Sequence, residues 1–176
     1  MPHKPAAVKL FIAILLGLIV TACGFQLRGA YSLPFATLYI SLPESSELYA
    51  QIRRNVESGS STRVINNSLA ADASLTVVSD NSQKNILSLS AAGRVTEFEL
   101  VRTFVFKLTD KSGTEMLGPS RIILRRELTF SDDQVLSKEA EELLLWRDIQ
   151  NDLVQQLMRR LAAAKPVVAN GQAPVK

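Results

Sequence analysis

Two stretches in which apolar and polar residues alternate, residues 94–110 and 121–130, constrain the fold of this chain most strongly. Successive side chains of a strand point to opposite faces, so one face of RVTEFELVRTFVFKLTD carries Phe98, Leu100, Phe104, Phe106 and Leu108. The other face carries Glu97, Glu99, Thr103 and Lys107. RIILRRELTF resumes the pattern after the turn sequence DKSG, with Ile122, Leu124, Leu128 and Phe130 inward. The pattern predicts an antiparallel sheet with one face on a core and the other in water.

Arg102 and Arg126 break this alternation, because both fall on the predicted apolar face. A β-bulge that shifts the register is one explanation, and we favour it. The alternative is that the sheet carries guanidinium groups beside an apolar surface. That arrangement would suit a ligand that is both phosphorylated and acylated.

The residues before this sheet predict a further strand, a helix and one ambiguous segment. FATLYIS, between Pro34 and Pro43, is typical of a strand. A helix follows PESS, with Leu48, Ile52 and Val56 on one stripe and its end at Gly59, and residues 57–73 are expected to form its last turn and a loop. SLTVVSD and KNILSLSA are either two arms of a bent strand or a loose hairpin around residues 80–81.

The last predicted element is a long helix that starts near Ser131 and ends at Pro166. Ser131 and Gln134 have the spacing of a capping box, and acidic residues gather toward the amino end while basic residues gather toward the carboxyl end. We expect this helix to cover the sheet through the apolar stripe Leu136, Ala140, Leu143, Ile149, Leu153, Leu157 and Leu161. Residues 166–176 are expected to form a disordered tail. Together these elements predict an α+β domain.

The amino-terminal residues have the order of a secretory signal. Lys4 and Lys9 precede the uncharged apolar run at residues 10–20. The small residues Thr21 and Ala22 then lead to Cys23. Residues 20–23, VTAC, resemble the lipobox of bacterial lipoproteins, in which the cysteine is acylated and the signal is cut just before it. We therefore expect a signal peptide over residues 1–22 and lipid attachment at Cys23.

A membrane-spanning helix and an ordinary signal peptide with an incidental cysteine both fit this segment less well. A spanning helix needs roughly 20 apolar residues, and this run has about half that length. An incidental cysteine would leave the lipobox positions unexplained. Several acyl chains at about 0.8 kcal/mol per buried methylene would anchor the protein durably, whereas one chain binds only marginally. The residue that follows Cys23 is glycine and not aspartate, which further resembles lipoproteins that are sorted to the outer membrane.

Composition excludes several functions for the processed chain. Cleavage after residue 22 removes two of the 20 lysines and arginines and none of the 17 acidic residues, so the net charge falls from +3 to +1. A charge this low does not favour a nucleic-acid binder. The only histidine, His3, would be removed and the only cysteine acylated, which excludes cysteine–histidine metal sites and histidine-assisted nucleophiles. No phosphate-binding glycine loop is present, so we expect no cofactor, no metal and no enzyme activity.

Several segments, in this order, resemble the lipopolysaccharide-assembly lipoprotein family LptE, formerly rare lipoprotein B. They are CGFQLRG, GRVTEFELVRTFVFKLTDKSG and RRELTFSDDQVLSKEAEELLLWRDIQNDLVQQLMRRL. The resemblance runs from Cys23 to about residue 161, is weak over residues 59–90 and is absent in the tail. It implies a domain over residues 23–165 in which two helices pack on one face of a four-stranded, mostly antiparallel sheet.

The resemblance also implies a function, a place and partners. It implies a lipoprotein held on the periplasmic face of the outer membrane, where it plugs the β-barrel protein LptD one-to-one and binds lipopolysaccharide. The family's ligand-binding basic residues match Arg94 and Lys138. Two alternatives remain open. One is an interaction module without lipopolysaccharide binding, and the other is a hydrolase using the carboxylates at residues 97 and 99, 132 and 133, or 139–142.

Overall fold

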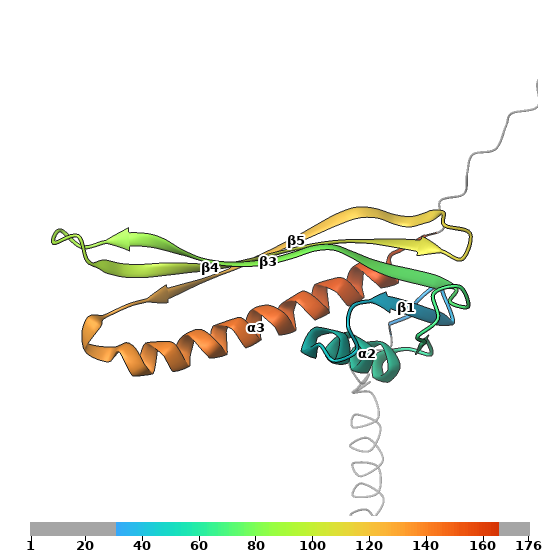
Figure 1. Cartoon of the computed structure of the whole chain (residues 1–176), viewed down its shortest axis with the longest axis horizontal. Coiled ribbons are helices and arrows are strands. Elements are labelled where there is room, and N and C mark those ends of the chain that lie inside the picture. Colours follow the sequence, from blue (N-terminus) through green and yellow to red (C-terminus); the bar gives the residue numbers. More distant parts are fainter. Residues whose placement is uncertain (1–30, 166–176) are drawn as a thin grey trace, which may run out of the picture. The chain divides into compact units, whose positions relative to one another are not determined.

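The structure, a computed structural model, describes residues 31–165; the predicted signal peptide, Cys23 and the predicted tail lie outside them. Both helices lie on one face of a single sheet with strand order β2-β1-β3-β4-β5 (Figure 1). The elements in chain order are β1 (Thr37–Ser41), α2 (Glu47–Gly59), β2 (Arg63–Val64), β3 (Ala73–Leu89), β4 (Val95–Asp110), β5 (Glu115–Thr129), the 3-10 turn η1 (Asp132–Gln134) and α3 (Val135–Ala162).

The α+β class and the placement of the helices are confirmed, whereas the predicted four-stranded, mostly antiparallel sheet is wrong in detail. The sheet has five strands and is mixed, because β1 pairs in parallel with both β2 and β3. The additional strand, β2, has only two residues and lies in the stretch for which the sequence predicts a loop. A strand this short carries no periodic signal, and its pairing with β1 depends on α2 returning the chain to that edge.

The ambiguous segment is one continuous strand, β3, and not a hairpin. It pairs with β1 only from Ala73 to Thr76, and it pairs with β4 along the whole length to Leu89. A register shift lies between Val77 and Ser79, just before residues 80–81 where the sequence predicts the bend or turn; at residues 80–81 the pairing with β4 is regular. The second half of β3 therefore extends beyond β1.

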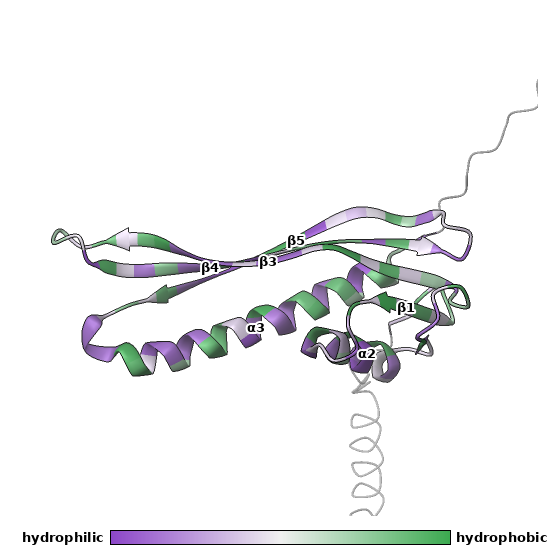
Figure 2. Ribbon diagram, in the orientation of Figure 1, coloured by the Kyte–Doolittle hydropathy of each residue, from purple (hydrophilic) through white to green (hydrophobic). Residues whose placement is uncertain are grey.

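The core lies between the sheet and the two helices. The predicted stripe of α2 is confirmed, since Leu48, Ile52 and Val56 are buried, and the helix begins with the Ser46 side chain accepting from the Tyr49 amide. Figure 2 shows apolar bands on the strands and helices that meet here, with β1 apolar along most of its length. The sheet's contribution is the predicted apolar face, with Leu100, Phe104, Phe106, Leu108, Ile122 and Leu128 almost fully buried.

Only the second half of the predicted α3 stripe is buried. Ile149, Leu153 and Leu157 are inaccessible to solvent, whereas Leu136 is 82% exposed and Leu143 is 72% exposed. The reason is the helical period: Ile149 follows Leu143 by six positions, and at about 100° per residue that step rotates the side chain by about 120° around the helix axis, away from the side that Leu143 occupies. Among residues 31–165, no helix is both long enough and apolar enough to span a membrane.

The predicted capping box at Ser131 and Gln134 is also wrong. The Ser131 side chain makes no capping hydrogen bond; instead its carbonyl accepts from the Gln134 amide at 3.1 Å. The intervening residues wind as the 3-10 turn η1, so α3 begins only at Val135. A capping box requires α-helical geometry directly after the cap residue, and the tighter turn removes it.

Candidate functional site

Arg94 lies in the turn between β3 and β4, at the end of the sheet that is farthest from β1. Gly93 adopts φ 75°, a left-handed conformation that favours glycine, and its amide donates to the Ser90 carbonyl at 2.9 Å. The Arg94 side chain is 73% exposed and lies 3.8 Å from an oxygen of Asp132. This turn therefore holds a guanidinium group in solvent, beside the segment that enters α3.

Lys138 lies in the first turns of α3 and is largely covered. Its side chain is only 16% exposed. The ammonium group donates to the Thr129 hydroxyl and to a Glu141 oxygen, both at 2.9 Å. The pairing with Glu141 follows from helical spacing, while the contact with β5 could not be predicted, because it depends on how α3 returns onto the sheet.

The two predicted binding residues meet the same stretch of chain. Arg94 contacts η1, and Lys138 contacts the last residue of β5, so both flank the connection from β5 to α3. A depression of about 180 Å³ beside Arg94 is lined also by Ser90, Thr96, Phe130, Asp132 and Asp133. Lys138 does not line it. The carboxylates of Asp132 and Asp133 give this depression a mixed charge.

Beside this connection, Lys84 bridges the sheet and α3, and two aromatic rings pack together. The Lys84 ammonium lies 4.2 Å from the centroid of the Phe98 ring and 2.6 Å from a Glu142 oxygen. Phe98 in turn packs edge-on against Phe130, with ring centroids 5.3 Å apart. Cations and apolar rings thus lie close together at this end. Sequence reasoning missed Lys84, although its alternation with Ile86 placed both on one face of the strand.

The favoured explanation of Arg102 and Arg126 is wrong, because no bulge separates them from the apolar face. The pairing of β4 with β5 is continuous from Glu97 to Phe106, so both arginines point toward the helices. Arg102 donates to both carboxylate oxygens of Asp80, at 2.9 and 2.7 Å, and to Gln150 of α3 at 3.2 Å. Arg126 pairs with Asp152 of α3. These carboxylates, which sequence reasoning did not identify, balance the two guanidinium groups.

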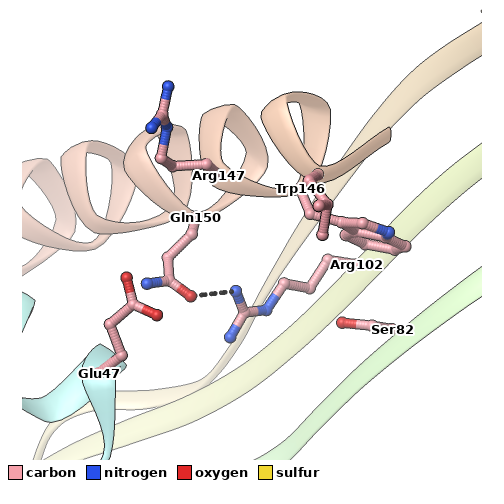
Figure 3. Close-up of a pocket in the computed structure, with 7 residues that line it drawn as sticks. Glu47, Ser82, Arg102, Trp146, Arg147 and Gln150 are labelled. Atoms are coloured by element: carbon pink, nitrogen blue, oxygen red, sulfur yellow. Dashed lines mark hydrogen bonds between the residues drawn. The ribbon is translucent and has the colours of Figure 1, made fainter. Parts of the chain in front are cut away.

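Arg102 also borders a groove of about 460 Å³ between β3, α2 and α3. Trp146, Arg147 and Gln150 of α3 and Glu47 at the start of α2 line this groove. Figure 3 shows Gln150 and Glu47 on the side of Arg102, whereas Arg147 points away from it. Leu143 and Ser82 complete its lining. The mixture of one aromatic ring, one exposed leucine and polar groups makes this a candidate protein-contact groove.

The carboxylates with shifted pKa values serve the fold. The pKa of Asp72 is lowered from its ordinary value of 3.8, mainly because the Thr37 hydroxyl and backbone amide hydrogen-bond to the charged form. The Ser112 hydroxyl likewise lowers the pKa of Asp110. A general acid requires the opposite shift. Within residues 31–165, no group of acidic, histidine or cysteine side chains has metal-binding geometry.

The family's sequence model, described as "LptE: Lipopolysaccharide-assembly", matches residues 35–161. The LPS-assembly lipoprotein LptE of Pectobacterium atrosepticum is 28% identical over all of this chain and 92% of its own length, and that of Yersinia pestis is 28% identical over 99% and 86%. The solution structure of an uncharacterized lipoprotein B from Nitrosomonas europaea is 38% identical, with a TM-score of 0.70 over 80% of this chain and 91% of that one.

The crystal structure of rare lipoprotein B from Shewanella oneidensis shares the fold, with a TM-score of 0.62 at 23% identity over 72% of this chain and 94% of that one. The resemblance found in the sequence is thus confirmed by the family match, the curated relatives and the fold. The chain belongs to the LptE family of lipopolysaccharide-assembly lipoproteins.

Proposed function

We propose that this protein is an outer-membrane lipoprotein of lipopolysaccharide assembly that binds lipopolysaccharide through Arg94 and Lys138. In this proposal, acyl chains on Cys23 hold the domain at the periplasmic face, and the domain plugs the β-barrel protein LptD as a one-to-one partner. Membership of the LptE family, whose curated relatives are named LPS-assembly lipoproteins, supports the role in assembly. The lipid anchor is supported by the lipobox-like residues 20–23.

The observation that carries ligand binding is the position of two cations around one connection, next to an aromatic pair. Arg94 contacts η1, Lys138 contacts Thr129, and Phe98 and Phe130 pack against each other beside them. Phosphate groups favour guanidinium and ammonium donors, and acyl chains favour apolar neighbours. A phosphorylated and acylated glycolipid has both kinds of group.

Both cations retain capacity to bind a phosphate. The pair between Arg94 and Asp132 is long and exposed on both sides, so it contributes little and a phosphate can displace the carboxylate. The Lys138 ammonium has three hydrogens, and its two contacts, with Thr129 and Glu141, leave one donor. We assign the first contact with the ligand to Arg94 because Lys138 is mostly covered.

The test compares lipopolysaccharide binding by the wild type and by the double variant Arg94→Asp, Lys138→Gln. Glutamine avoids placing a carboxylate next to Glu141, so the variant remains folded. Each lost charged hydrogen bond costs about 1.5 to 3 kcal/mol where it is shielded and less where it is wet. We expect at least a roughly tenfold weaker affinity for the double variant, which corresponds to about 1.4 kcal/mol.

Affinity is measured by titrating the purified lipidated protein, in mild detergent, with fluorescent lipopolysaccharide. Arg54→Asp is the matched control, because Arg54 is an exposed arginine on α2. It changes the net charge as Arg94→Asp does and should leave affinity unchanged. Equal binding by the wild type and the double variant would contradict the assignment of these two residues.

The second candidate is an interaction module that binds the barrel without binding lipopolysaccharide. The presence of Asp132, Asp133 and Glu141 around the two cations favours it, because the site carries no clear excess of positive charge. Co-purification of the lipidated protein with its barrel partner tests the interaction. A wild-type complex that forms one-to-one but does not bind lipopolysaccharide would establish this alternative.

A further inference from the structure

Beyond the end of β1, the second half of β3 has an open edge. Only Ala73 to Thr76 of β3 pair with β1, and β4 occupies the opposite edge throughout. All residues from Val78 to Leu87 are exposed. Within residues 31–165, therefore, no strand pairs with this edge of residues 78–87. An edge of this kind presents backbone donors and acceptors that another strand can satisfy.

The register identifies which backbone groups face the open edge. The Phe130 amide donates to the Thr96 carbonyl, so even-numbered residues of β4 direct their backbone groups toward β5 and odd-numbered ones toward β3. The odd-numbered Val101 of β4 is paired with Gln83 of β3. The remaining, alternate residues of β3 direct their N–H and C=O groups away from β4, to the open edge; they are Asp80, Ser82, Lys84 and Ile86.

The two charged residues of this segment, Asp80 and Lys84, point inward and are paired within the domain. Asp80 is held by both guanidinium contacts from Arg102. Lys84 lies over the Phe98 ring and pairs with Glu142 of α3. Inward-pointing charges on an edge strand usually discourage pairing with another chain, because an added strand would bury them. Here Asp80 and Lys84 each have a partner of opposite charge within the domain, so an added strand would not bury an unpaired charge.

Apolar side chains lie along the second half of β3 and on the α3 side of the groove. In β3, Ile86 is 59% exposed and Leu89 is 57% exposed. Across the groove of about 460 Å³, α3 presents Leu143 and Trp146. Figure 3 shows Trp146 of the helix and Ser82 of the strand on either side of the Arg102 side chain at this groove. A strand added at this edge would place every second side chain into the groove, next to these apolar groups.

We propose that the open edge of β3, from Asp80 to Ile86, binds an extended segment of the barrel partner as an additional strand of the sheet. This inference rests on the proposed function for the identity of the partner. The segment is a loop or a chain terminus, because the strands of a closed barrel are paired on both sides and have no free edge. Backbone hydrogen bonds provide the affinity, and an apolar side chain in the groove provides the specificity.

Proline at Ser82 tests the proposal directly. Ser82→Pro removes an amide that faces the open edge, which edge strands tolerate, so the domain should remain folded. We expect at least a tenfold loss of barrel protein recovered with the tagged, lipidated full-length chain. Glu127→Pro is the matched control, since Glu127 is an odd-numbered residue of β5 and directs its amide to the opposite edge. It should leave recovery unchanged.

Amide hydrogen exchange provides a measurement that does not depend on a variant. In the complex, the amides of Ser82 and Lys84 should exchange at least tenfold more slowly than in the free protein, whereas those of β5 facing the opposite edge should not change. Wild-type protein that recovers no barrel would overturn the proposed function as well. Recovery with neither protection nor an effect of Ser82→Pro would overturn strand addition alone. Protection in the free protein at twice the monomer mass would assign the edge to a second copy.

Discussion

Replacement of Arg102 by methionine should destabilise the domain, because it leaves Asp80 without its partner. The Arg102 side chain is only 11% exposed, and it makes two hydrogen bonds to Asp80 and one to Gln150. A hydrogen bond to a charged group contributes about 1.5 to 3 kcal/mol where it is shielded. The Asp80 side chain is 28% exposed, so water replaces part of the hydrogen bonding that is lost. We expect the free energy of unfolding to fall by about 2 to 3 kcal/mol in total.

Urea unfolding of the chain without its first 23 residues, followed by circular dichroism, measures this change. A double-mutant cycle with Arg102→Met and Asp80→Asn should yield a coupling energy of about 1 to 2 kcal/mol. The control cycle uses Arg125 and Glu99, a 3.4 Å pair in which Arg125 is 63% exposed; its coupling should stay below about 0.5 kcal/mol. Equal coupling energies in the two cycles would refute the claim that the fold shields the Arg102 pair.

Three further predictions address the anchor, the core and the acid stability of the protein. Cys23→Ala should abolish incorporation of labelled palmitate and leave a precursor that is not correctly cleaved. Leu153→Ala should lower the free energy of unfolding by about 2 to 5 kcal/mol, whereas Leu143→Ala, at an exposed position of the same helix, should change it by less than about 0.5 kcal/mol. The folded state lowers the pKa of Asp72. The stability from its hydrogen bonds with Thr37 is therefore present above about pH 3.8, the ordinary pKa of an aspartate, and is lost as the pH falls further. Asp72→Asn should make the free energy of unfolding depend less on pH in this acid range.

The elements with a long periodic signal could be predicted from the sequence. The alternation in β4 and β5 identified the apolar face, and the four-residue spacing of Leu48, Ile52 and Val56 identified α2. Burial of one face of each element requires apolar residues at a fixed period, so both patterns can be recognised in the sequence. The same reasoning failed at β2, where two residues are held by pairing with β1 and leave no periodicity of their own.

The candidate site was only partly predictable, for a different physical reason. Sequence reasoning singled out Arg94, Lys138, Arg102 and Arg126 as basic residues, but their environments depend on tertiary contacts. The cover over Lys138 comes from Thr129 of another element, and Asp152 pairs with Arg126 across the interface between helix and sheet. The carboxylate partners of the three arginines lie tens of residues away in the sequence, where no local spacing rule applies, so they could not be assigned in advance. Only Glu141, one helical turn from Lys138, follows from local spacing.

The change of character along the buried side of α3 has a consequence for how the domain opens. From Ile149 onward this side is apolar and inaccessible, whereas nearer the amino end it is formed by Lys138 and Glu142, which hydrogen-bond to the sheet. Water can replace those polar contacts but cannot compensate for exposure of the apolar part. The first turns of α3 therefore separate from the sheet by local fluctuation at much lower free energy than global unfolding, and amide exchange along this one helix should slow progressively toward its carboxyl end.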